Sequence, residues 1–100
     1  MPVLLQVDFP SPGPFGAEAA QMLRELAESI AREPGLIWKI WTENAAEKTA
    51  GGVYLFEDAA SARAYLEMHT ARLQGMGFAD IRARVFDINA PLSAIDRAPL

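Results

Sequence analysis

Four short segments of this chain have the apolar pattern and the flanking Gly, Pro and Asn residues that are typical of β-strands. In the first, Val3 to Phe9, apolar residues occupy every second position. The second, Gly35 to Glu43, contains both tryptophans. A polar loop, Asn44 to Thr49, separates it from the third, Gly51 to Phe56, so these two segments predict a hairpin. The fourth runs from Ile81 to Ile88.

Two longer segments carry apolar residues at helical spacing. The first runs from about Phe15 to Arg32 and keeps its glutamates on the opposite side. The second runs from about Ala59 to Gln74, with Asp58 as a favourable N-cap. Its predicted apolar stripe consists of Ala62, Leu66, His69 and Leu73. After the last strand we expect only a tail, which contains Pro91 and Pro99.

The predicted order of elements is β-α-β-β-α-β, which is the ferredoxin-like arrangement of one antiparallel sheet under two helices. A chain of 100 residues has room for one domain of common size. We therefore expect a single α+β domain over residues 1–100, without a linker or a low-complexity segment.

The two tryptophans predict that both faces of the sheet are covered. Trp38 and Trp41 are three residues apart on one strand, so their side chains should point to opposite faces. On this reasoning Leu36 and Ile40 share the face of Trp38, and Ile37 shares the face of Trp41. Two helices can cover only one face. We therefore predict a homodimer in which two sheets meet face to face, with the helices outside.

Composition and charge exclude several classes of protein. The net charge of −4 argues against binding to nucleic acid, which depends on clustered Lys and Arg. No stretch is apolar enough to span a membrane, and the N-terminus lacks the pattern of a signal peptide. The chain has no cysteine, so it has neither disulfides nor a thiol nucleophile. Cytoplasm is the expected location.

Common catalytic and cofactor motifs are also missing. With one histidine and no cysteine, a histidine-rich metal site cannot be built within one chain. No serine lies in a GxSxG pattern, and no GxGxxG pattern precedes a helix. We attribute Gly51 and Gly52 to close backbone approach within the sheet. These patterns predict no metal, nucleotide or flavin.

The remaining candidates for chemistry are the histidine and the aromatic residues. His69 is either a core histidine satisfied by one hydrogen bond or a general acid or base whose pKa is moved by burial. Tyr65 and Arg72 are about one helical turn away on either side and could converge on one pocket edge. Trp38, Trp41, Tyr54 and Phe56 could line a flat apolar cavity or could form plain core. Lys39 and Glu43, which share the face of Trp41, could pair with each other or with charges across a dimer interface, and for them we expect a structural salt bridge.

The sequence resembles the YdhR family of monooxygenases from Leu4 to about Leu100, without an evident gap. In the first half the segments that carry the resemblance are Leu4-Leu5-Gln6, Gly13-Pro14-Phe15-Gly16, Trp38-Lys39-Ile40-Trp41-Thr42-Glu43 and Gly51-Gly52-Val53-Tyr54-Leu55-Phe56. In the second half they are Ala64-Tyr65-Leu66-Glu67, His69-Thr70-Ala71-Arg72-Leu73, Val85-Phe86-Asp87-Ile88-Asn89 and Pro91-Leu92-Ser93.

The resemblance implies a dimeric α+β barrel with a pocket in each protomer. It also implies oxidation of a small electron-rich aromatic substrate by O₂ without a cofactor, as in enzymes of the wider superfamily. In that mechanism His69 would accept a proton or donate to the developing oxyanion. Trp38, Trp41, Tyr54 and Tyr65 would bind the substrate, and Arg72 would stabilise the anion.

Two alternatives remain open at this point. The superfamily includes haem-degrading monooxygenases, which use a histidine ligand with tryptophan and asparagine in the pocket. The asparagines here are Asn44, in a loop, and Asn89, near the end of the last strand, so that set is not recognisable. The other alternative is a non-catalytic protein that binds a small hydrophobic molecule. A shared fold does not decide among these functions.

Overall fold

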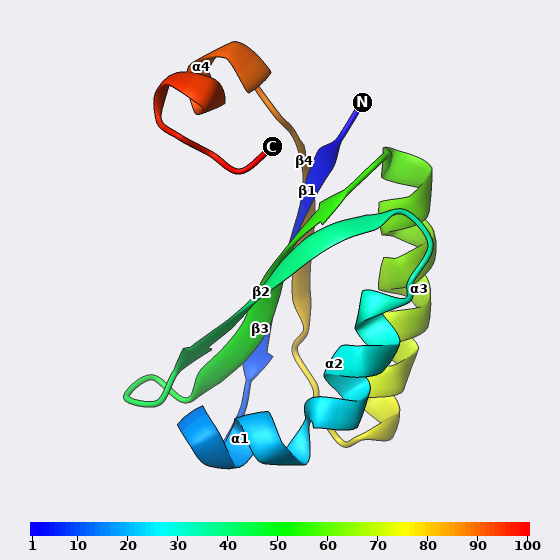
Figure 1. Cartoon of the computed structure of the whole chain (residues 1–100). Coiled ribbons are helices and arrows are strands. Elements are labelled where there is room, and N and C mark those ends of the chain that lie inside the picture. Colours follow the sequence, from blue (N-terminus) through cyan, green and yellow to red (C-terminus); the bar gives the residue numbers. More distant parts are fainter.

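The computed structural model, which describes residues 1–100, has the predicted ferredoxin-like arrangement (Figure 1). The strands are β1 (Val3–Pro10), β2 (Leu36–Asn44), β3 (Thr49–Phe56) and β4 (Arg82–Asp87). They form one antiparallel sheet in the order β2-β3-β1-β4. The helices are α1 (Gly16–Met22), α2 (Arg24–Ala31), α3 (Ala59–Gly75) and α4 (Ala90–Ile95). No helix is long and apolar enough to cross a membrane.

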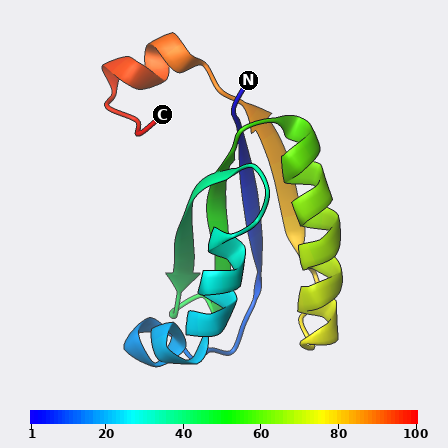
Figure 2. The same ribbon diagram turned by 45° about the vertical axis from the view of Figure 1, so that its right-hand side comes forward.

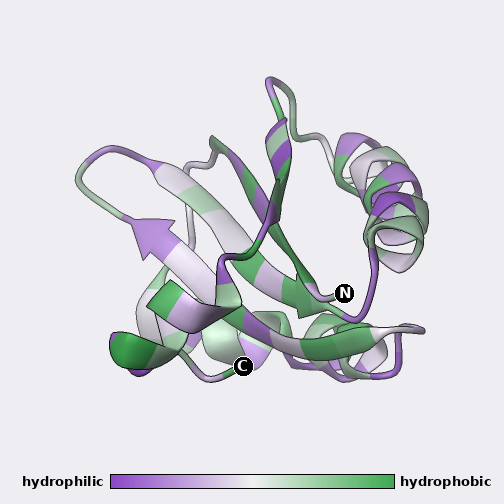
Figure 3. Ribbon diagram, turned by 90° about the horizontal axis from the view of Figure 1, so that it is seen from above, coloured by the Kyte–Doolittle hydropathy of each residue, from purple (hydrophilic) through white to green (hydrophobic).

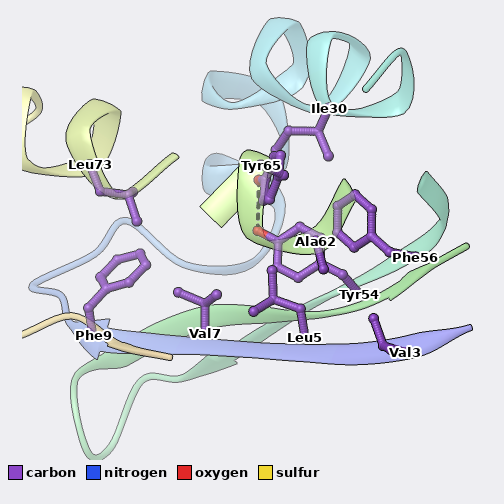
Figure 4. Close-up of a cluster of buried hydrophobic side chains, with 10 residues drawn as sticks. All are labelled: Val3, Leu5, Val7, Phe9, Ile30, Tyr54, Phe56, Ala62, Tyr65 and Leu73. Carbon is purple, nitrogen blue, oxygen red and sulfur yellow. Dashed lines mark hydrogen bonds between the residues drawn. The ribbon is translucent and has the colours of Figure 1, made fainter. Parts of the chain in front are cut away.

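The main core lies between the sheet and the helices α2 and α3, which cover the same face of the sheet (Figures 1 and 2). Alternate residues of β1 point into it because side chains of a strand alternate between faces. Figure 3 shows the same alternation as hydrophobic and hydrophilic bands along the strands. The core side chains are Val3, Leu5, Val7, Phe9, Ile30, Tyr54, Phe56, Ala62, Tyr65 and Leu73 (Figure 4).

The helix α3 follows the prediction closely. Asp58 is its N-cap, and the carboxylate accepts a hydrogen bond of 2.7 Å from the backbone N–H of Ser61. The buried residues are Ala62, Tyr65, His69 and Leu73, so Tyr65 takes a place in the stripe that the sequence pattern assigned to Leu66. Leu66 is half-buried at the edge of the core.

The first predicted helix, 15–32, is wrong as a single element. It divides at Leu23, whose φ of −99° and ψ of 10° leave the helical range. The N–H of Leu23 still donates to the carbonyl of Ala19, and the N–H of Ala27 donates to the carbonyl of Leu23. The chain therefore turns sharply between α1 and α2 without leaving these backbone groups unpaired (Figure 1).

The predicted tail contains a further short helix, α4, which is capped by Asn89 through a 3.2 Å hydrogen bond from the N–H of Leu92. Figures 1 and 2 show α4 and the C-terminus on the side of the sheet away from α2 and α3. There the indole Nε1 of Trp38 donates a 2.8 Å hydrogen bond to the carbonyl of Pro99. Leu55, the neighbour of Trp38 in the ladder, is fully buried on this outer face.

The register of the ladder confirms that Trp38 and Trp41 point to opposite faces. Trp38 pairs with Leu55 on the outer face, and Trp41 pairs with Gly52 on the helix-covered face. The expectation for Leu36 is wrong, because an irregularity between Leu36 and Trp38 shifts the parity and packs Leu36 against the core. The outer face is only partly covered within one chain.

Candidate active site

A partly open cavity of about 90 Å³ lies on the helix-covered face of the sheet. β1, β2, β3, α3 and the α1–α2 junction all contribute to its walls, which are mainly apolar. The polar side chains that line it include Ser11, Lys39, Tyr54 and His69. No carboxylate lines this cavity.

Tyr54 and Tyr65 form a buried pair beside the cavity (Figure 4). The hydroxyl of Tyr65 donates to the hydroxyl of Tyr54 over 3.0 Å, and the ring centroids are 5.0 Å apart. Burial raises the pKa of Tyr54 to about 12 and also raises the pKa of Tyr65. Both phenols are therefore neutral at physiological pH and can act as hydrogen-bonding groups but not as bases.

His69 is held between Tyr65 and Arg72. Its ring stacks on that of Tyr65 with centroids 5.0 Å apart, and only 3% of the residue is exposed. Nη2 and Nε of Arg72 lie 2.9 and 3.3 Å from Nδ1 of His69. A guanidinium can only donate, so Nδ1 accepts and the imidazole proton is on Nε2.

Three effects lower the pKa of His69 to about 3: burial, then the positive charge of Arg72, then that of Lys39. At neutral pH His69 is thus an uncharged imidazole that can donate through Nε2. Because a second proton on the ring is strongly disfavoured, His69 is better suited to donate a hydrogen bond than to accept a proton.

Lys39 lines the cavity. Its Nζ lies 3.3 Å from the centroid of the Trp41 ring and 4.7 Å from that of Tyr54. Burial, followed by the charge of Arg72, lowers the pKa of Lys39 to about 7. The expected pairing of Lys39 with Glu43 is wrong, since neither ion pair of the chain contains Lys39 and the Glu43 carboxylate accepts instead from the backbone N–H of Gly16.

The absence of a side chain at Gly52 allows Lys39 to lie against the rings of Trp41 and Tyr54. A Cβ on Gly52 would come within 2.6 Å of Cε of Lys39. A Cβ on Gly51 would instead lie 2.0 Å from the carbonyl oxygen of Val7 on the neighbouring strand. The two glycines of β3 therefore have different tasks, because Gly51 allows the strands to pair and Gly52 leaves room for the side chain of Lys39.

The structure brings only part of the predicted site together. His69, Tyr54 and Trp41 line the cavity. Tyr65 and Arg72 lie behind His69, where they contact its ring and its Nδ1.

Trp38 lies on the other face of the sheet and does not line the cavity. Lys39 was missed as a site residue, although strand parity with Trp41 could have placed it there. No group of three or more His, Cys, Asp or Glu residues is arranged to hold a metal ion.

The fold and the cavity define an α+β ferredoxin-like domain with an aromatic site between sheet and helices. Solved structures that share this fold include NE2512 and SnoaB. NE2512, a protein of unknown function from Nitrosomonas europaea, is 15% identical with a TM-score of 0.65, over 88% of this chain and 89% of that chain. SnoaB, a cofactor-independent oxygenase from Streptomyces nogalater, is 16% identical with a TM-score of 0.61, over 88% of this chain and 93% of that chain.

The chain belongs to the family described as "Putative mono-oxygenase ydhR", which matches residues 4–99. No curated protein sequence matches the chain. The membership confirms the family to which the sequence motifs pointed, and it assigns the chain to a family of monooxygenases.

Proposed function

We propose that this protein is a cofactor-independent monooxygenase that oxidises a small electron-rich aromatic substrate, such as a phenol or an anthrone, with O₂. One observation carries the proposal. The cavity has aromatic walls, and the groups that can meet a negative charge in it, Lys39 and the Nε2–H of His69, are not neutralised by any carboxylate. Such a site favours an anion that is delocalised over an aromatic ring.

The chemistry follows from the stability of that anion. Removal of a proton from the substrate gives a resonance-stabilised carbanion, which can pass one electron to O₂ directly. The protein supplies shape, exclusion of water and hydrogen-bond donors in fixed positions. In this scheme Tyr54 and Trp41 bind the ring, and Nε2–H of His69 donates to the developing oxyanion. Arg72 holds His69 in the tautomer that donates.

The size of the cavity limits what can enter. A cavity of about 150 Å³ is large enough for benzene, so the 90 Å³ found here must widen before a ring can bind. Met22 and Met76 line the cavity and are 62% and 49% exposed, which places flexible side chains where it can open. A single ring, or one ring of a larger substrate, is the expected occupant.

The proposed assembly is a homodimer joined through the outer faces of the two sheets. Ile40 and Phe86 point to this face and are 54% and 41% exposed in the single chain. With the sheets face to face, the cavity of each protomer stays on the helix side.

The test uses the two tryptophans as reporters. The protein is titrated with monocyclic and tricyclic hydroxyaromatics and, separately, with haem, in the presence of a chelator. Tryptophan fluorescence is followed while an electrode records dissolved O₂. Saturable quenching by a hydroxyaromatic with protein-dependent O₂ uptake is the expected result. Quenching without O₂ uptake would indicate a binding protein, and tight binding of haem alone would indicate haem chemistry.

A further inference from the structure

Lys39 is a half-buried amine without an acidic partner within the chain. The two ion pairs of the chain are Arg24–Glu28 and Arg82–Asp8, and both are on the surface. The lysine amine instead lies against the faces of Trp41 and Tyr54, inside the cavity. Lysine side chains are mostly exposed, so an unpaired amine that lies in a cavity against two aromatic rings requires an explanation.

The groups that face the amine come from two strands and one helix. On β3 it meets the neutral phenol of Tyr54, and on α3 it is near the neutral His69 and the positive charge of Arg72. On β2 itself, Glu43 shares the face of Lys39 but is bound to the N–H of Gly16. No neighbouring residue supplies a negative charge to the amine, so the ammonium of Lys39 is free to pair with a negatively charged ligand.

We propose that Lys39 is the proton acceptor of the site and that the ligand is an acidic phenol whose ionised oxygen pairs with the Lys39 ammonium. This inference rests on the proposed function, and it gives the acceptor role to a residue other than His69. In the transfer, the Nζ lone pair forms a bond to the phenolic proton, the O–H bond breaks, and its electron pair stays on the oxygen.

The surroundings of Lys39 favour this step in both states. Before transfer, burial lowers the pKa of the amine to about 7, so that much of it is neutral near neutral pH, where a base has to accept a proton. After transfer, the ammonium lies on the Trp41 face, where a cation–π contact stabilises it. The phenolate then has two donors, the ammonium of Lys39 and the Nε2–H of His69.

The experiment measures proton uptake without any turnover. 4-Nitrophenol serves as the probe in an anaerobic, weakly buffered solution at about pH 8, where a lysine with a pKa near 7 is neutral and the probe is mostly ionised. Binding of the phenolate should raise the pKa of Lys39 and take up close to one proton per site. A pH-indicator dye reports the uptake, and the visible band of the phenolate reports binding.

Matched variants separate a proton acceptor from a mere positive charge. Lys39→Arg keeps the cation but cannot accept a proton, so it should bind the phenolate with no proton uptake. Lys39→Met removes the charge and should weaken phenolate binding about tenfold or more, as expected for a lost charge partner. Lys48→Met, at the chain's other lysine in the exposed β2–β3 turn, should behave as the wild type.

Each other outcome overturns the inference. Equal proton uptake by Lys39→Arg and wild type would give the acceptor role to another group. Equal phenolate binding by Lys39→Met would remove Lys39 from the site. Failure of the wild-type protein to bind the probe would exclude this ligand class. Because O₂ is absent, proton uptake by Lys39 can be found even if O₂ consumption is never observed, so the two proposals can fail separately.

Discussion

At the scale of single residues, the contact between Arg72 and His69 limits what the histidine can do. The guanidinium fixes the acceptor at Nδ1, and with burial it keeps the ring neutral far below the usual pKa of histidine. The same positive charge also lowers the pKa of Lys39. One arginine thus leaves His69 only its Nε2–H to donate and helps to lower the pKa of Lys39, without itself lining the cavity.

This arrangement predicts a specific dependence of stability on pH. The folded pKa of His69, about 3, lies below its usual value of 6.5. As the pH falls from 6.5 to about 3, His69 binds a proton in the unfolded chain but not in the folded chain. The free energy of unfolding therefore decreases as the pH decreases. Between these limits the wild type should lose about 1 kcal/mol per pH unit more than His69→Gln. Urea denaturation at several pH values measures the free energy of unfolding of both proteins. The same pH dependence in the wild type and in His69→Gln would contradict the prediction.

The two glycines of β3 give a second prediction, about the position of Lys39. Gly52→Ala should displace the lysine toward water and raise its pKa, at a cost of about 1 kcal/mol in stability. Gly51→Ala should cost about 3 kcal/mol or more, because its Cβ meets the backbone of β1.

NMR of ¹³C-labelled lysine follows the titration directly, since the chain has only Lys39 and Lys48. Thermal melting compares the two glycine variants. An unchanged titration of Lys39 in Gly52→Ala would show that the glycine does not position it.

The tyrosine pair gives a third prediction. Tyr54→Phe leaves the buried hydroxyl of Tyr65 without its acceptor and should cost about 1–3 kcal/mol, whereas Tyr65→Phe should cost about 1 kcal/mol. The double variant should be no less stable than Tyr54→Phe, because both hydroxyls are then gone. A double-mutant cycle measures the coupling, and simple additivity of the two costs would mean that the hydrogen bond contributes nothing.

At the scale of elements, the sequence predicted what depends on short-range periodicity. Strand parity placed Trp38 and Trp41 on opposite faces, and Asp58 marked the start of α3. The break at Leu23 could not be predicted, because no Gly or Pro lies there and the helical spacing of apolar residues continues through it. The irregularity beside Leu36 was also not predicted, because an uninterrupted run of strand-forming residues gives no sign of a bulge.

The site was predictable to the same degree. His69, Tyr54 and Trp41 could be found by residue type, because aromatic and titratable side chains stand out in a sequence. Lys39 could not be recognised in this way, since a lysine in a strand is ordinarily paired or exposed. Its position and its lowered pKa depend on the space left by Gly52 and on the charge of Arg72, which only the packed structure brings together.

The C-terminal segment gives a prediction at this scale. The carbonyl of Pro99 accepts from the indole of Trp38, so removal of residues 98–100 should expose the indole and cost about 1 kcal/mol. In a Trp41→Phe background, where Trp38 is the only tryptophan, its fluorescence should shift to longer wavelength. For a domain of this size the melting temperature should fall by about 4–8 °C. Identical spectra with and without the segment would show that this contact does not shield Trp38.

At the scale of the whole molecule, the two faces of the sheet are linked through β2. Lys39 and Trp41 point into the cavity, while Ile40, which lies between them in sequence, points to the outer face. Whatever packs on Ile40 therefore supports the strand that positions the amine. A second copy of the chain on this face would hold β2 from both sides.

The dimer gives the last prediction. Ile40→Glu should place a charge in the proposed interface and yield monomers, whereas Met68→Glu, on the exposed side of α3, should not. Light scattering should give the wild type twice the chain mass of 10.9 kDa and the Ile40 variant once that mass. The loss of packing on β2 should also raise the pKa of Lys39 in the Ile40 variant, because a looser strand admits water to the amine. A monomeric wild type, or a dimer that survives Ile40→Glu, would mean that this face is not the interface.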